Sequence, residues 1–172
     1  MEKETQQLFL YSCTGTFQEI LRLNCSTGRV SGAKMVEGDN KTPEGIYFFT
    51  KIHENSELAP IYGIRAFVSD YPNFTDRSEG RGGSAIWLHG TNKILRDRDS
   101  SGCVALENEN VEKLTQYITL NRTPLIIAQK LSYTPNDPAM TEALQKFLSD
   151  WNNAVQSGSY SENRASNDTE RG

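Results

Sequence analysis

The feature that most constrains the fold of this chain is a series of short, strand-like segments separated by turn-forming residues. Residues 18–24 alternate in the period-two manner of a strand, and residues 45–51 are rich in β-branched and aromatic side chains. Clusters of Gly, Pro, Asn, Asp and Ser punctuate these segments. Further strands are predicted over residues 8–12, 30–36, 66–69, 85–88 and 125–129. Many short strands and few helices predict a mainly β fold with a β-sandwich or barrel-like core.

Two peripheral helices are predicted after the last cysteine. One covers residues 111–118, with Asn108 or Asn110 as its N-cap. The second covers residues 138–155 and begins at Pro138, a residue favoured at the first helical position. An apolar stripe runs along this second helix. Packing against the domain is the main expectation for the stripe, and binding of a partner is the alternative.

The ends of the chain differ in composition from this core. Residues 1–7 are mostly polar, and residues 157–172 are almost entirely Ser, Asn, Glu, Arg and Gly. Such a tail buries too little apolar area to offset its ordering entropy, so it is predicted to be a disordered tail or a linker. One folded domain is therefore predicted over residues 8–156 of the 172-residue chain.

Composition also restricts the class of partner. The net charge is −4 and no basic run is present, so a nucleic-acid partner is not expected. The sequence contains no stretch of 18 apolar residues, so a membrane span is not predicted. No signal peptide is visible, which leaves a cytoplasmic protein or a piece of a longer exported chain. With two histidines and no Cys-x-x-Cys motif, a metal site is not expected either.

The sequence holds three cysteines, Cys13, Cys25 and Cys103, so at least one thiol is free. A hairpin loop at residues 14–16 would leave Cys13 and Cys25 separated along one strand by roughly 26 Å, at ~3.3 Å per residue. That separation is far beyond the reach of a disulfide. Both residues are therefore predicted to be small, partly buried strand residues.

The pattern that carries chemistry is a strand that ends at His89-Gly90, followed by Ser101-Gly102-Cys103 before an apolar run. A thiol attacks a carbonyl as the thiolate, and a neighbouring imidazole takes its proton and later protonates the leaving group. We expect Cys103 as nucleophile, His89 as base, and the Gly90 carbonyl as the group that orients the imidazole. Backbone amides of residues 101–103 would form an oxyanion hole. The alternative is a buried structural cysteine and a hydrogen-bonded histidine.

These segments resemble the L,D-transpeptidase (YkuD-type) family, in which a His-Gly pair precedes a Ser-x-Gly-Cys stretch. Gly38 with residues 42–47 resembles the family's Gly…Thr-Pro-x-Gly turn and strand, and residues 62–63 and 70–73 also fit. The resemblance covers about residues 8–130. It implies a mainly β fold without cofactor, and a monomer in the periplasm or cell envelope that acts on peptidoglycan stem peptides. It also implies a thioester formed at the L-centre carbonyl of diaminopimelate in a tetrapeptide stem, with release of D-alanine.

Two positions depart from the family pattern. Ser101 replaces a histidine before the Gly-Cys pair, and Ala105 replaces an arginine two residues after the cysteine. The sequence resembles more closely a branch that includes L,D-carboxypeptidases, in which water resolves the thioester. Three functions therefore remain open: transpeptidation, hydrolysis of tetrapeptide to tripeptide, and cell-wall binding by a module without activity.

Four further residues are candidates for substrate binding. Tyr62 would line the groove by resemblance, although an aromatic core role is an equal alternative. Trp87 lies on the strand face of His89, where core packing is the first expectation and a groove wall the second. Arg96 and Arg98 lie in the loop before the cysteine, which is predicted to be a solvated lid. An arginine there would pair with a carboxylate of the stem.

Overall fold

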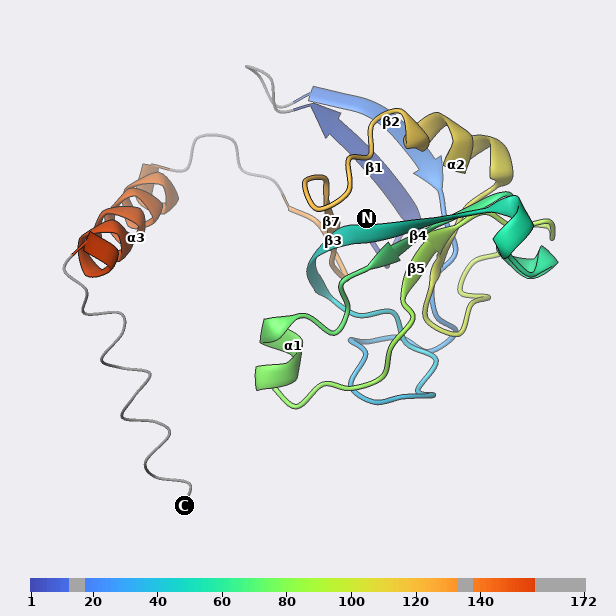
Figure 1. The fold of residues 1–172 in the computed structure, drawn as a ribbon, viewed down its shortest axis with the longest axis horizontal. Coiled ribbons are helices and arrows are strands. Elements are labelled where there is room, and N and C mark those ends of the chain that lie inside the picture. Colours follow the sequence, from blue (N-terminus) through green and yellow to red (C-terminus); the bar gives the residue numbers. More distant parts are fainter. Residues whose placement is uncertain (13–17, 133–137, 157–172) are drawn as a thin grey trace. The chain divides into compact units, whose positions relative to one another are not determined.

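The computed structural model describes residues 1–12, 18–132 and 138–156 of the chain. The chain divides into two compact units, Met1–Leu131 and Ser132–Gly172. Within the second unit, helix α3 spans Pro138–Gln156 (Figure 1). The predicted hairpin loop at 14–16, Cys13 and the tail 157–172 lie outside the described residues. The assignment of α3 to the same domain as the strands stays a prediction.

The first unit is mainly β with few helices, which confirms the predicted fold class (Figure 1). Strands β1 (Gln7–Ser12) and β2 (Gln18–Asn24) form an antiparallel pair. A curled five-stranded sheet has the order β6-β5-β4-β3-β7. Its strands are β3 (Gly45–Glu54), β4 (Arg65–Ser69), β5 (Trp87–His89), β6 (Val104–Ala105) and β7 (Pro124–Ile127).

The core is built from the inward-facing positions of both sheets and from helix α2 (Asn108–Thr115). In β7, Leu125 and Ile127 are buried while Ile126 between them is exposed, as the period of two requires. Helix α2 contributes Val111 and Leu114. A small domain gains most of its stability from burying apolar area in this way.

The only parallel pairing among the described strands joins β5 to β6, with Leu88 opposite Val104 and His89 opposite Ala105. Cys103 directly precedes β6, so this register brings it beside the strand that ends at His89. A parallel pair needs a crossover connection, which here is the polar loop 90–103. The pairing thereby brings together His89 and Cys103, which are fourteen positions apart in the sequence.

Residues 1–7, whose polar composition led us to leave them outside the predicted domain, belong to the first compact unit. The Met1 side chain is 4% exposed and belongs to the core cluster. The amide of Glu2 donates to the Gln7 carbonyl, and that of Lys3 donates to the Ala128 carbonyl. These backbone hydrogen bonds hold the segment in place despite its polar composition. Its buried polar side chains also have hydrogen-bond partners.

The predicted strand at 30–36 is wrong. This segment contains no described strand, because the Asp39 carboxylate accepts the backbone amides of Met35, Val36 and Lys41 and organises a loop. Side-chain acceptors of this kind compete with ladder pairing. These hydrogen bonds, with one from Lys34, hold the pKa of the Asp39 carboxyl well below its ordinary value despite its burial.

Two loop segments have local structure of their own. In residues 26–28, Ser26 pairs with Ala105 and Gly28 with Ser100. The long loop 70–84 contains a short helix, α1 (Phe74–Ser78), which Asn73 caps. Its capping box had a recognisable signal, an Asn followed three residues later by an acidic side chain. None of the described helices is long and apolar enough to cross a membrane.

Candidate active site

His89 stands at the end of β5 and is 5% exposed. Its Nδ1 lies 2.5 Å from the carbonyl oxygen of Gly90. Because a carbonyl only accepts, this hydrogen bond assigns the proton of the neutral ring to Nδ1 and leaves Nε2 as the basic nitrogen. Burial lowers the His89 pKa, and the Gly90 hydrogen bond opposes that shift. The ring is therefore neutral at neutral pH.

Asn108 fixes the turn that follows His89. Its Oδ1 accepts the Ile64 amide at 3.2 Å, and its Nδ2 donates to Oδ1 of Asn92 at 2.8 Å. A Cβ added at Gly63 or at Gly90 would overlap Asn108 Oδ1, so both glycines are required by close approach. Asn108 is the first residue of α2 rather than its N-cap, and its side chain serves the turn instead.

The Cys103 side chain is partly buried, and its thiol donates to the Ala85 carbonyl oxygen at 3.4 Å. Burial raises the pKa of the Cys103 thiol, whereas the Trp87 backbone amide and the Lys34 charge lower it. Within the described ranges no hydrogen bond joins this thiol to the His89 ring. At rest the site therefore holds a thiol and a neutral imidazole rather than an ion pair.

Position 102 requires a glycine because of its backbone conformation and a close backbone neighbour. Its φ of +135° is disfavoured for other residues, and a Cβ there would lie 2.8 Å from the Lys41 carbonyl oxygen. The Thr42 hydroxyl donates to the Gly102 carbonyl at 2.9 Å and accepts the Gly28 amide at 2.8 Å. The fully buried Thr42 thus ties the segment before Cys103 to two other loops.

The amides of residues 101–103 differ in their hydrogen bonds. The Gly102 amide donates to Ser100 Oγ at 3.0 Å, and that hydroxyl donates to the Cys103 carbonyl at 2.6 Å. The amides of Ser101 and Cys103 have no hydrogen-bond partner among the described residues. These two amides, rather than that of Gly102, are free to donate to an incoming oxyanion.

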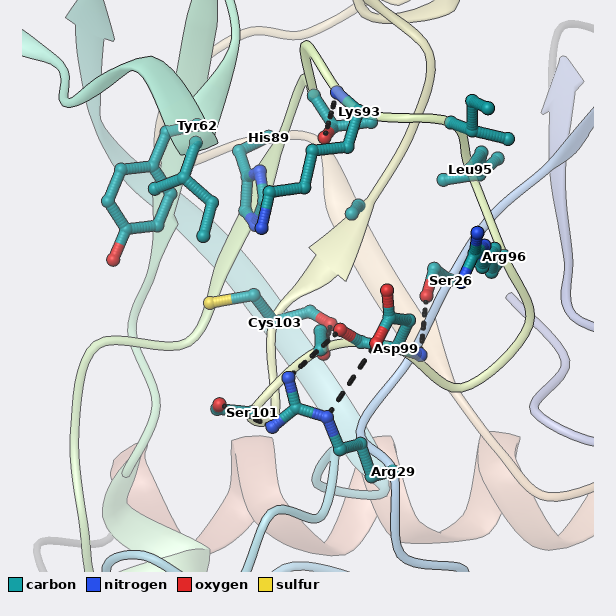
Figure 2. A pocket seen from close by; sticks show the side chains of 15 residues that line it. Ser26, Arg29, Tyr62, His89, Lys93, Leu95, Arg96, Asp99, Ser101 and Cys103 are labelled. Carbon is teal, nitrogen blue, oxygen red and sulfur yellow. Dashed lines mark hydrogen bonds and ion pairs between the residues drawn. The ribbon is translucent and has the colours of Figure 1, made fainter.

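His89 and Cys103 line one pocket of about 190 Å³. Figure 2 shows the His89 ring between Tyr62 and Lys93, with Cys103 below it and Arg29 and Asp99 across the pocket. Since small-molecule pockets usually measure ~300–1,000 Å³, this pocket would enclose only part of a peptide substrate.

Of the four predicted substrate-binding residues, Tyr62 and Arg96 line this pocket, and Trp87 and Arg98 do not. The Trp87 ring lies 5.1 Å from that of Tyr62, which in turn lies edge-on to His89 at 5.0 Å. Trp87 thus supports the wall behind Tyr62. Arg98 donates to the Lys3 carbonyl at 3.0 Å and is held away from the pocket by that contact.

Sequence reasoning missed Arg29 and Lys93, which line the same pocket. Arg29 reaches it because its amide donates to the Ser100 carbonyl, a pairing between distant loops. No local pattern marks either residue, so no sequence signal would have identified them. Among the described residues, no three His, Cys, Asp or Glu side chains form a group suited to a metal ion.

Comparison with known proteins agrees with this geometry. Residues 2–127 match the family model described as YkuD, L,D-transpeptidase catalytic domain. The chain is 29% identical over 119 residues to YafK of Escherichia coli K12, which covers 68% of this chain and 45% of that protein.

Two solved structures are also similar. Bd1075 of Bdellovibrio bacteriovorus superposes with a TM-score of 0.75 and 32% identity, covering 89% of this chain and 55% of that one. The helical cell shape determining protein Pgp2 of Campylobacter jejuni gives a TM-score of 0.67 and 32% identity, covering 76% of this chain and 46% of that one. The chain thus spans about half the length of the relatives that it matches. Because the match extends over most of the domain, the chain belongs to the YkuD family of L,D-transpeptidase catalytic domains.

Proposed function

We propose that this domain is a cysteine acyl-transfer enzyme that acts on the tetrapeptide stems of peptidoglycan in the cell envelope. The observation that supports it is that Cys103 and a neutral, oriented His89 line the same pocket. The free Nε2 of His89 is the base that the thiol requires. The Gly90 carbonyl fixes the tautomer from the other side of the ring.

In the first half-reaction, the Cys103 side chain rotates from its contact with the Ala85 carbonyl to another staggered position. The thiol proton passes to Nε2 of His89, and the sulfur adds to the L-centre carbonyl of diaminopimelate. The amides of Ser101 and Cys103 donate to the oxygen that becomes negative. The tetrahedral intermediate collapses, the peptide C–N bond breaks, and the imidazolium protonates the departing amine of D-alanine. A thioester on Cys103 remains.

In the second half-reaction, either water or the amine of a second stem resolves the thioester. The cations around this pocket favour water, because Arg29, Lys93 and Arg96 face only one carboxylate, Asp99. An amine acceptor arrives mostly as an ammonium ion, which such a surface repels. The pocket therefore supports hydrolysis to the tripeptide as the main outcome, with transpeptidation as the second candidate.

A third candidate is a wall-binding module that has kept the fold without the chemistry. Ala105 lines the pocket where the family pattern has an arginine, which favours this reading. Arg29 places a guanidinium in the same pocket from another loop, so the pocket still contains an arginine. Covalent labelling distinguishes a binder from an enzyme.

The test is incubation of the purified domain with a tetrapeptide muropeptide, followed by mass spectrometry. We expect tripeptide and free D-alanine, whereas a cross-linked dimer would mean transfer to a second stem. Cys103→Ala and His89→Gln should abolish the reaction, while His53→Gln, which changes the other histidine, should leave it intact.

A carbapenem supplies a test without the natural substrate. An adduct on the wild type that is lost in Cys103→Ala would support an acylating cysteine. Turnover that persists in Cys103→Ala would refute the proposal. Binding of muropeptide without turnover or adduct, by a protein whose circular dichroism shows it folded, would favour the wall-binding module.

A further inference from the structure

The pocket around Cys103 carries a charge opposite to that of the whole chain. Three cationic side chains, Arg29, Lys93 and Arg96, line it together with a single carboxylate, Asp99. The excess is two positive charges, in a chain whose net charge is −4. A concentration of one sign in a concave site attracts ligands of the other sign.

The three cations are not equivalent. Arg29 is already engaged, since its Nε lies 3.7 Å from Asp99 Oδ1 and its Nη1 donates to Ser101 Oγ at 3.3 Å. Lys93 and Arg96 make no ion pair or side-chain hydrogen bond with any described residue. The pair also lines an adjoining hollow of about 410 Å³. Two unpaired cations thus stand where the pocket continues away from Cys103.

Carboxylates are the groups that suit these side chains. A guanidinium binds a carboxylate through two parallel N–H donors, and an ammonium binds it as a point charge. Two unpaired cations that line one hollow match a ligand that carries two carboxylates. The D-centre of diaminopimelate and the terminal D-alanine of a tetrapeptide stem each carry one.

We infer that Lys93 and Arg96 form a carboxylate subsite that selects stems in which both of these carboxylates are free. This inference rests on the proposed function for the identity of the ligand. It goes further in naming the feature that the enzyme selects. A stem amidated at the D-centre, or one that ends in an amide, would be a poor substrate.

A first test uses the thiol itself and no peptidoglycan. Iodoacetate is an anion and iodoacetamide is its neutral counterpart, and both react with the thiolate. The ratio of their rates at Cys103, followed by peptide mass mapping and divided by the ratio in urea, therefore reports the charge of the pocket alone. We expect this normalised ratio to be about threefold to tenfold above one at low salt and to fall as salt is added.

The double variant Lys93→Gln/Arg96→Gln should bring the normalised ratio close to one. Lys113→Gln, which removes an exposed charge on α2 away from the pocket, is the matched control and should leave it unchanged. A wild-type ratio near one, or an equal loss in the control, would overturn the subsite.

A second test compares three synthetic tetrapeptides: the free acid, the D-centre amide and the C-terminal amide. For the wild type, we expect kcat/KM to fall about tenfold with each amide, the cost of one charge-assisted contact. In the double variant, kcat/KM should fall about a hundredfold for the free acid and about tenfold for each amide, which still carries one carboxylate, so that the three peptides become equivalent. Equal turnover of all three peptides by the wild type would refute the selection.

The two tests separate this inference from the proposed function. If alkylation shows the charge preference but no stem is turned over, the anion subsite stands and the stem is not its ligand. The proposed selection of stems would then be rejected. Turnover without charge preference or discrimination would keep the reaction and reject the subsite.

Discussion

Replacing Thr42 by valine tests how the segment before Cys103 is held. The hydroxyl is fully buried, donates to the Gly102 carbonyl at 2.9 Å and accepts the Gly28 amide at 2.8 Å. Valine keeps the branched shape and removes both hydrogen bonds. Two buried polar groups from two different loops would then lack partners.

The magnitude follows from these two groups. A neutral buried donor or acceptor left unsatisfied costs about 1–3 kcal/mol. Two such groups, with partial relaxation of the loops, predict a loss of about 3 kcal/mol in the free energy of unfolding. A domain of this size has ~5–15 kcal/mol in total, so the loss is large. It corresponds to a fall of roughly 10 °C in Tm.

The assay is urea unfolding of the wild type, Thr42→Val and Thr42→Ser, followed by circular dichroism. Serine keeps the hydroxyl and loses one methyl group, so we expect a cost of about 1 kcal/mol. The difference between the two variants isolates the hydrogen bonds. If valine were as stable as serine, the hydroxyl would contribute nothing and the reasoning would be refuted.

The remaining predictions concern the site. Because burial raises the pKa of Cys103, its rate of alkylation by iodoacetamide should rise at a higher pH in the native protein than in urea, and coincident profiles would contradict this. Because burial lowers the pKa of His89, the ring stays neutral until the pH falls below its ordinary 6.5, so the acid limb of kcat/KM should have its midpoint below that value. The same shift implies that stability is lost as the pH falls below the unfolded-state pKa, which urea titrations at pH 5 and 7 would measure. Gly102→Ala should cost about 2–4 kcal/mol, from its φ of +135° and its approach to the Lys41 carbonyl, and an unchanged urea midpoint would refute that account. Asn108→Ala should lower kcat more than it raises KM, because it frees the turn after His89; an unchanged kcat would argue against this role.

Most of the strands could be predicted from the sequence because their signals are local. Alternation in residues 18–24 and β-branched residues from Gly45 onward predict strands whichever partners they later pair with. The segment 30–36 shows the limit of this reasoning. Its apolar residues resemble a strand, but the Asp39 carboxylate accepts hydrogen bonds from the backbone amides of Met35 and Val36 and holds the segment as a loop. A side chain that competes for backbone groups leaves no trace in periodicity.

The proposed nucleophile and base were also identified as candidates from the sequence. His89-Gly90 and Gly102-Cys103 each mark the end or the beginning of a strand, and the parallel pairing of β5 and β6 brings them to one pocket. The hydrogen bonds of the site were not accessible. Whether the Gly102 amide is free depends on the position of Ser100 Oγ, which the loop conformation decides.

The sequence by itself determined the alternation of the strands, the helix that follows Cys103 and the candidate nucleophile and base. Each of these depends on residues that are close together in the sequence. Only the tertiary structure decided which cations enter the pocket, which of them remain unpaired and why Met1, Glu2, Lys3 and Gln6 are buried. Arg29 and Ser101 are brought together across 72 positions. Contacts of that kind depend on how the whole chain packs, and a pattern read along the sequence contains no information about them.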